Sequence, residues 1–153
     1  MSPHFIRFIL GETDSEILFF IILSEVMKYG LNKNSIAKAI NKILEIIGPF
    51  EINTDADDSH TFLSFILTNG KHMAAFQGGK SLYYSSHKTK CPESGTCNFY
   101  NDTCEKKVSN KTIVNHLLFS SEPLSGQNEW TKMKPGEFVM VDSEMEFSIN
   151  KII

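Results

Sequence analysis

A short polar cluster, Thr13-Asp14-Ser15-Glu16, stands directly ahead of the apolar residues 17–23. Two carboxylates and two hydroxyls in four residues could bind a ligand, or they could simply begin a helix. Thr13 and Glu16 have the Ser/Thr-x-x-Glu spacing of a capping box, and Asp14 falls in the first turn, where the positive helix end favours an anion. The pattern alone leaves both interpretations open.

A second group of reactive side chains consists of His87, Cys91, Cys97 and Cys104, which lie in a polar segment over residues 87–111. One histidine and three cysteines could bind zinc, but their spacing is looser than the short Cys-x-x-Cys pairs of structural zinc sites. The pattern therefore favours a loop with free thiols and no assigned metal, and a small zinc-stabilised binding domain stays as an alternative. An odd number of cysteines argues against a disulfide framework.

The elements that must position these groups follow an α+β order. A short strand is expected over residues 5–10, a helix from Thr13 to Gly30, and a second helix from Asn34 or Ser35 to Gly48. An acidic loop follows over residues 51–59. About six mostly antiparallel strands are then expected, over residues 61–68, 71–76, 81–86, 113–121, 137–141 and 145–148. The first two strands of that set flank Asn69-Gly70, a strong hairpin signal.

The composition excludes some classes of protein. A chain of 153 residues suits a single domain over residues 1–153, and its net charge of −3 lacks the basic stripe of a nucleic-acid binder. The apolar run at residues 17–23 is shorter than the roughly 20 residues that span a bilayer. The first residues lack the pattern of a secretory signal. These features predict a cytoplasmic protein without a membrane or nucleic-acid partner.

Three segments together resemble one family. The sequence TDSEIL at residues 13–18 is followed by Leu23-Ser24-Glu25, then by a hairpin-like stretch at residues 65–84, and then by HLLFSSEPLSGQNEWTKMKPGEFVMVD at residues 116–142. In this order and at these separations, the segments are similar to those of the class II glutamine amidotransferases. The resemblance covers nearly the whole chain.

The resemblance implies a fold, a reaction and a role for one residue. The family folds as a four-layer αββα sandwich of the N-terminal-nucleophile hydrolase type, and an N-terminal cysteine attacks the side-chain amide of glutamine or a γ-glutamyl compound. An Asn-Gly pair forms the oxyanion hole. The aspartate that matches Asp14 binds the α-amino group of the substrate, and the chemistry implies no cofactor.

The chain departs from the family ahead of this motif. In the family the Cys-Gly start, a substrate-binding arginine and the Asn-Gly pair all precede the aspartate, but only 13 residues precede Asp14 here. Asn69-Gly70 falls in the downstream hairpin, and Ser2 lies too close to the motif to replace the cysteine. We therefore expect a partial αββα sandwich that lacks the N-terminal catalytic segment, contains no catalytic residue and is inactive alone. A separately encoded N-terminal half would complete it, and a degenerate, non-catalytic interaction module is the alternative.

Overall fold

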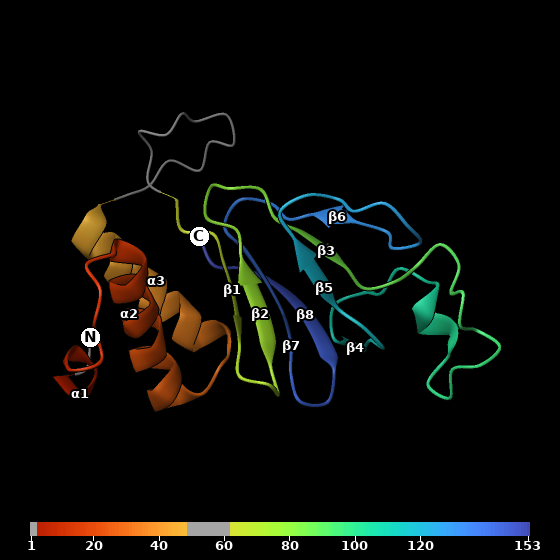
Figure 1. The fold of residues 1–153 in the computed structure, drawn as a ribbon, viewed down its shortest axis with the longest axis horizontal. Helices are drawn as coiled ribbons and strands as arrows, with labels where there is room; N and C mark the ends of the chain where they lie inside the picture. Colours follow the sequence, from red (N-terminus) through yellow and green to blue (C-terminus); the bar gives the residue numbers. More distant parts are fainter. Residues whose placement is uncertain (1–2, 49–61) are drawn as a thin grey trace. The chain divides into compact units, whose positions relative to one another are not determined.

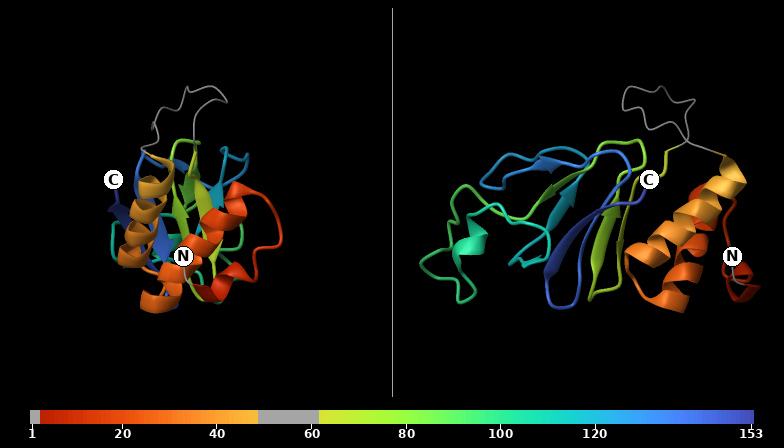
Figure 2. Two further views of the ribbon diagram at one scale, coloured as in Figure 1. Left: turned by 90° about the vertical axis from the view of Figure 1, so that its left-hand side faces the viewer. Right: turned by 180° about the vertical axis from the view of Figure 1, so that it is seen from behind.

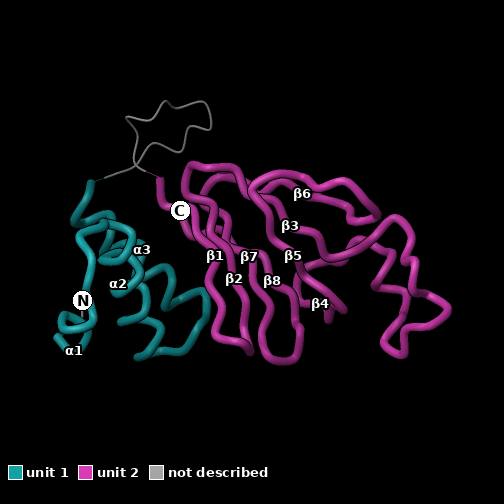
Figure 3. Tube along the Cα trace, viewed as in Figure 1, with its two compact units in different colours: residues 1–50 teal, residues 51–153 magenta. Residues whose placement is uncertain are grey.

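A computed structural model describes residues 3–48 and 62–153 of the chain. These residues fall into two compact units, unit 1 within residues 1–50 and unit 2 within residues 51–153 (Figure 3). The acidic loop expected at residues 51–59 lies outside the described residues. Within the described ranges, no helix combines the length and the apolar character that crossing a membrane requires.

Unit 1 is helical and contains α1 (Pro3–Ile6), α2 (Asp14–Tyr29) and α3 (Lys33–Ile47). The long helices α2 and α3 lie side by side, joined by residues 30–32 (Figures 1 and 2). The helix α3 buries one apolar face, with Ile36, Ile40 and Ile43 completely inaccessible to solvent. Both helices end at the predicted glycines, Gly30 and Gly48, whose positive φ angles of 76° and 82° suit a residue without a Cβ atom.

The strand predicted near the start of unit 1 is wrong. The strand expected over residues 5–10 is instead the short helix α1 followed by a turn, in which the amide of Phe8 donates to the carbonyl of Phe5 at 2.9 Å. Phe5 is buried, and its ring lies 5.6 Å from that of Phe20, so packing on α2 has overridden the strand preference of the segment.

The N-cap of α3 also differs from the prediction of Asn34 or Ser35. Asn32 caps the helix, since its Oδ1 accepts from the amides of Asn34 and Ser35 at 2.9 and 3.1 Å. The Ser35 hydroxyl accepts in return from the Asn32 amide at 3.2 Å. Ser35 thus belongs to the cap, but as the third helical residue of a capping box.

Unit 2 consists of two antiparallel sheets. The larger sheet has the strand order β1 (Phe65–Thr68), β2 (Met73–Phe76), β7 (Glu137–Val141), β8 (Glu146–Lys151) and β4 (Thr112–Ile113) (Figure 1). The smaller has the order β5 (Leu118–Ser120), β3 (Tyr83–Ser85) and β6 (Thr131–Lys132). The expected hairpin at Asn69-Gly70 joins β1 to β2, and the Asn69 side chain accepts from the amides of Lys71 and His72. Helices followed by antiparallel sheets confirm the α+β class.

The described residues contain eight strands where about six were expected. The apolar run at residues 113–121 does not form one strand but divides between β4 and β5, which belong to different sheets. The chain changes sheet across residues 114–117, where Val114 and Leu117 are buried in the core. The two-residue strand β6 was not predicted, because it is too short to show an alternating pattern.

The core of unit 2 lies between the two sheets. Tyr84 of β3 and Phe147 of β8 meet across it, with ring centroids 5.5 Å apart. The buried cluster takes residues from both sheets and from the segments between them: Ala75, Leu82, Tyr84, Val114, Leu117, Met133, Val139, Val141 and Phe147. The two sheets therefore form the ββ layers expected of the sandwich.

A buried carboxylate links the two long helices of unit 1. Glu25 of α2 is only 3% exposed and pairs with Lys42 of α3 and, at 3.2 Å, with Lys28. The hydrogen bond from Lys42 is the main cause that holds the pKa of the Glu25 carboxyl below its ordinary value of 4.5, and it outweighs burial, which raises that pKa. Folding thus favours the ionised carboxylate.

We predict that Glu25→Gln lowers the free energy of unfolding of the helical unit by about 1–2 kcal/mol at pH 7, a modest value because both lysines are half exposed. Since the folded-state pKa is lowered, the stabilisation is complete above pH 4.5 and is lost as the pH falls through the folded-state pKa. Urea unfolding followed by helical circular dichroism measures the effect, and the fluorescence of the single tryptophan, Trp130, reports on unit 2. Exposed Glu45 of α3 provides the matched control, Glu45→Gln, and equal effects of the two substitutions at all pH values would contradict the prediction.

Candidate functional site

Asp14 is the first residue of α2 and is exposed. One carboxylate oxygen, Oδ1, accepts from the amide of the next residue, Ser15, at 2.7 Å. Among the described residues, no lysine, arginine or histidine side chain forms an ion pair with this carboxylate. Asp14 thus presents an anion at the N-terminus of a 16-residue helix, and such a group can bind an ammonium ion.

The predicted capping box at this helix start is wrong, and its acid has another role. Thr13 is the N-cap residue, as expected, but its side chain makes no capping hydrogen bond. The Glu16 carboxylate instead accepts from the backbone amides of Leu10 and Gly11, at 3.1 and 2.7 Å. These bonds hold residues 10–11, which precede the helix, against its first turn.

Gly11 leaves room for this arrangement. A Cβ atom at residue 11 would lie 2.8 Å from Oε2 of Glu16, closer than nonbonded atoms approach, so a larger residue would displace the carboxylate. The sequence alone gave no sign of this contact, because a carboxylate five residues away from its partner does not follow any helix-start motif. The glycine and the glutamate together fix the backbone that precedes Asp14.

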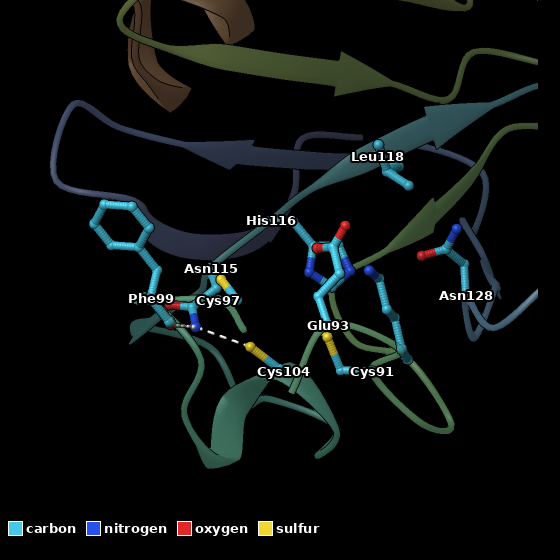
Figure 4. Close-up of a pocket in the computed structure, with 10 residues that line it drawn as sticks. Cys91, Glu93, Cys97, Phe99, Cys104, Asn115, His116, Leu118 and Asn128 are labelled. Carbon is cyan, nitrogen blue, oxygen red and sulfur yellow. Dashed lines mark hydrogen bonds between the residues drawn. The ribbon is translucent and has the colours of Figure 1, made fainter. Parts of the chain in front are cut away.

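The second group of candidate residues lines a pocket in unit 2 with a volume of about 420 Å³. Figure 4 shows the three sulfur atoms of Cys91, Cys97 and Cys104 facing this space, together with the imidazole of His116. The full lining consists of Lys88, Cys91, Glu93, Cys97, Phe99, Cys104, Asn115, His116, Leu118 and Asn128. The structure therefore brings the three predicted cysteines together, but with His116 in the place expected for His87.

The pocket shows no ready metal site. Within residues 3–48 and 62–153, no three His, Cys, Asp or Glu side chains are arranged so that they could hold one metal ion. All three cysteines are free thiols. Cys104 has a polar partner of another kind, because the Asn115 side-chain amide donates to its sulfur at 2.9 Å (Figure 4).

Burial keeps both histidines of this region neutral near pH 7. Desolvation is the main cause that lowers the pKa of His116, and the proximity of Lys88 and of a second titratable imidazole, His87, lowers it further. Desolvation likewise lowers the pKa of His87, with Glu129 acting against it. Nε2 of His116 and Nδ1 of His87 are both buried without a hydrogen-bond partner among the described residues. His116 is thus a neutral base beside the thiols, a role that its sequence position did not suggest.

The comparison with protein families shows one family for this chain. The family model described as "Glutamine amidotransferases class-II" matches residues 6–150. No curated protein matches the chain. A solved structure described as a glutamine aminotransferase class-II domain protein from Silicibacter pomeroyi is similar, with a TM-score of 0.61 and 20% sequence identity. That likeness covers 98% of this chain and 56% of the solved chain, and at this identity it shows a shared fold.

We predict that Glu16→Ala releases residues 10–11 from the start of α2, because it removes the acceptor of two backbone amides. Hydrogen exchange at the Leu10 and Gly11 amides should accelerate about tenfold, as expected for the loss of a hydrogen bond to a charged acceptor. The neighbouring substitution Glu12→Ala is the control, since Glu12 is exposed. Unchanged exchange at Gly11 in the Glu16 variant would show that the carboxylate does not hold this segment.

Proposed function

Since this chain belongs to the class II glutamine amidotransferases, we propose that it is the part of a glutaminase domain that binds the substrate's α-amino group through Asp14. The single observation that carries the proposal is the position of Asp14. Its carboxylate is exposed at the N-terminus of α2 and has no ion-pair partner among the described residues. A γ-glutamyl substrate brings the complementary group, an ammonium beside a carboxylate.

The reaction of the complete domain is hydrolysis of a side-chain amide. A cysteine thiolate attacks the amide carbon, the oxyanion hole stabilises the tetrahedral intermediate, and ammonia leaves with the proton that the thiol gave up. Water then hydrolyses the thioester to release glutamate. We assign the nucleophile and the oxyanion hole to a Cys-Gly and an Asn-Gly segment that precede Asp14 in the family order. The chain spans 56% of the length of the solved relative, and the family order alone carries this assignment.

In this proposal, Asp14 acts mainly by positioning the substrate. An ion pair at the α-amino group lies several bonds away from the amide carbon, so it contributes binding and orientation and not proton transfer. The Glu16 contacts support this role indirectly, because they fix the backbone that leads to Asp14. Loss of the pair should therefore raise KM more than it lowers kcat.

The first test measures ammonia release from glutamine with and without the segments that we assign to the nucleophile and the oxyanion hole. We expect the isolated chain to release no ammonia from glutamine above background. Co-expression with a segment encoded directly upstream, beginning Met-Cys-Gly and containing an Asn-Gly pair, should restore release and allow a glutamine-like electrophile to label the cysteine of that segment. Ammonia release by the chain alone would overturn the assignment of the nucleophile. A reconstituted pair without activity would favour the alternative of a non-catalytic interaction module.

The second test addresses Asp14 in the reconstituted enzyme. Asp14→Asn should lower kcat/KM for glutamine by about 10- to 100-fold, mostly through KM, the range expected for a hydrogen bond to a charged group. The control is Glu12→Gln, which removes an exposed acid two residues away and should leave kcat/KM unchanged. Equal effects of the two substitutions would show that Asp14 acts only through the overall charge.

A further inference from the structure

The pocket of unit 2 contains chemistry that amide hydrolysis does not use. Two of its thiols, Cys91 and Cys104, are almost completely buried, with exposed fractions of 5% and 7%. The third, Cys97, is half-buried. We infer that the pocket is a thiol oxidation site, in which hydrogen peroxide converts Cys91 and Cys104 into a reversible disulfide.

Two hydrogen bonds connect the segments that contain these two cysteines. The amide of Lys88 donates to the carbonyl of Cys104 at 2.8 Å, and the amide of Cys91 donates to the side-chain carboxylate of Glu105 at 2.7 Å. Lys88 and Cys91 are thus each bound to one of the consecutive residues 104 and 105, and both cysteines line the same pocket. A disulfide needs this kind of proximity, because it requires Cα atoms about 4.4–6.8 Å apart.

Cys97 is held differently. Its amide donates to the carbonyl of Glu93 at 2.8 Å, and its carbonyl accepts from the amide of Tyr100 at 3.2 Å. Both bonds lie within residues 93–100, and neither connects Cys97 to residues 104–105. Cys97 lines the same pocket, but we exclude it from the disulfide, so it is the matched control for the two proposed cysteines.

The side chains around the pair favour thiol chemistry. The Asn115 amide donates to the sulfur of Cys104 and keeps it directed into the pocket (Figure 4). His116 is neutral near pH 7, so it can accept the proton that a thiol must lose before its sulfur attacks.

The reaction balances with peroxide as the only oxidant. The sulfur of Cys104, after losing its proton, attacks one oxygen of hydrogen peroxide, the O–O bond breaks, and the departing hydroxide takes up a proton to become water. The sulfur of Cys91 then attacks the resulting sulfenic acid, the S–O bond breaks, and a second water leaves. Two thiols lose two electrons and two protons, and one peroxide is reduced to two waters.

The test starts from the reduced, purified chain treated with a small excess of hydrogen peroxide. We expect the loss of two of the three free thiols, the loss of two hydrogens from the intact mass, and full recovery on addition of a dithiol reductant. Trypsin leaves all three cysteines in one peptide, residues 91–106. Digestion after glutamate and after aromatic residues separates them, and the expected product joins residues 91–93 to residues 101–105.

Single substitutions complete the test. Cys91→Ser and Cys104→Ser should each abolish the cross-link, whereas Cys97→Ser should retain it. A cross-link that includes Cys97, oxidation that stops at the sulfenic or sulfinic acid, or one zinc ion bound per chain would each overturn the inference. Because peptide mapping of the unsubstituted chain identifies the pair directly, the inference remains testable even if a variant fails to fold. The outcome is independent of amide hydrolysis and of Asp14.

Discussion

The start of α2 is the constraint on which the functional interpretation depends. The carboxylate of Glu16 turns back to the amides of Leu10 and Gly11, and this contact, possible because residue 11 has no side chain, fixes the backbone that precedes the helix. Asp14 is thereby left at the exposed end of the helix, where the peptide dipoles favour an anion. An acid that served only to cap the helix would direct its oxygens at the free backbone amides of the first turn. Glu16 turns away from them. Asp14 directs only Oδ1 at one of them, the amide of Ser15, and its Oδ2 accepts no hydrogen bond within the described residues.

The rest of unit 1 gives this helix a rigid support. A buried glutamate, Glu25, joins α2 to a lysine of α3, and isoleucines of α3 are fully excluded from water. A helix that is held along its length and at its entry can present one carboxylate in a fixed direction, which is what recognition of a small amino acid requires. Unit 2 has its own core between its two sheets and contains the pocket that the three cysteines line.

The sequence predicted features that rest on long, regular patterns. The two helices with their terminal glycines, the Asn-Gly hairpin and the α+β order all follow from periodicity and turn chemistry, and the structure confirms them.

Features that depend on distant contacts were missed. Phe5 packs on Phe20 and so forms a helix in place of a strand, and the run at residues 113–121 divides where it crosses between sheets. His116, and not His87, lines the pocket together with the three cysteines. This follows from how the chain folds in three dimensions, and no spacing rule could have selected His116 over His87. The predictions of a single domain, of a missing catalytic segment and of cytoplasmic location stay predictions.

The most direct test of the central claim compares two substrates in the reconstituted enzyme. Glutamine carries the α-ammonium group, and its analogue without that group, the half-amide of glutaric acid, does not. If Asp14 binds the ammonium, the enzyme with Asp14 prefers glutamine in kcat/KM by about 10- to 100-fold, and Asp14→Asn removes most of that preference. A preference that stays the same after the substitution would show that the ammonium is bound elsewhere, and would contradict this account.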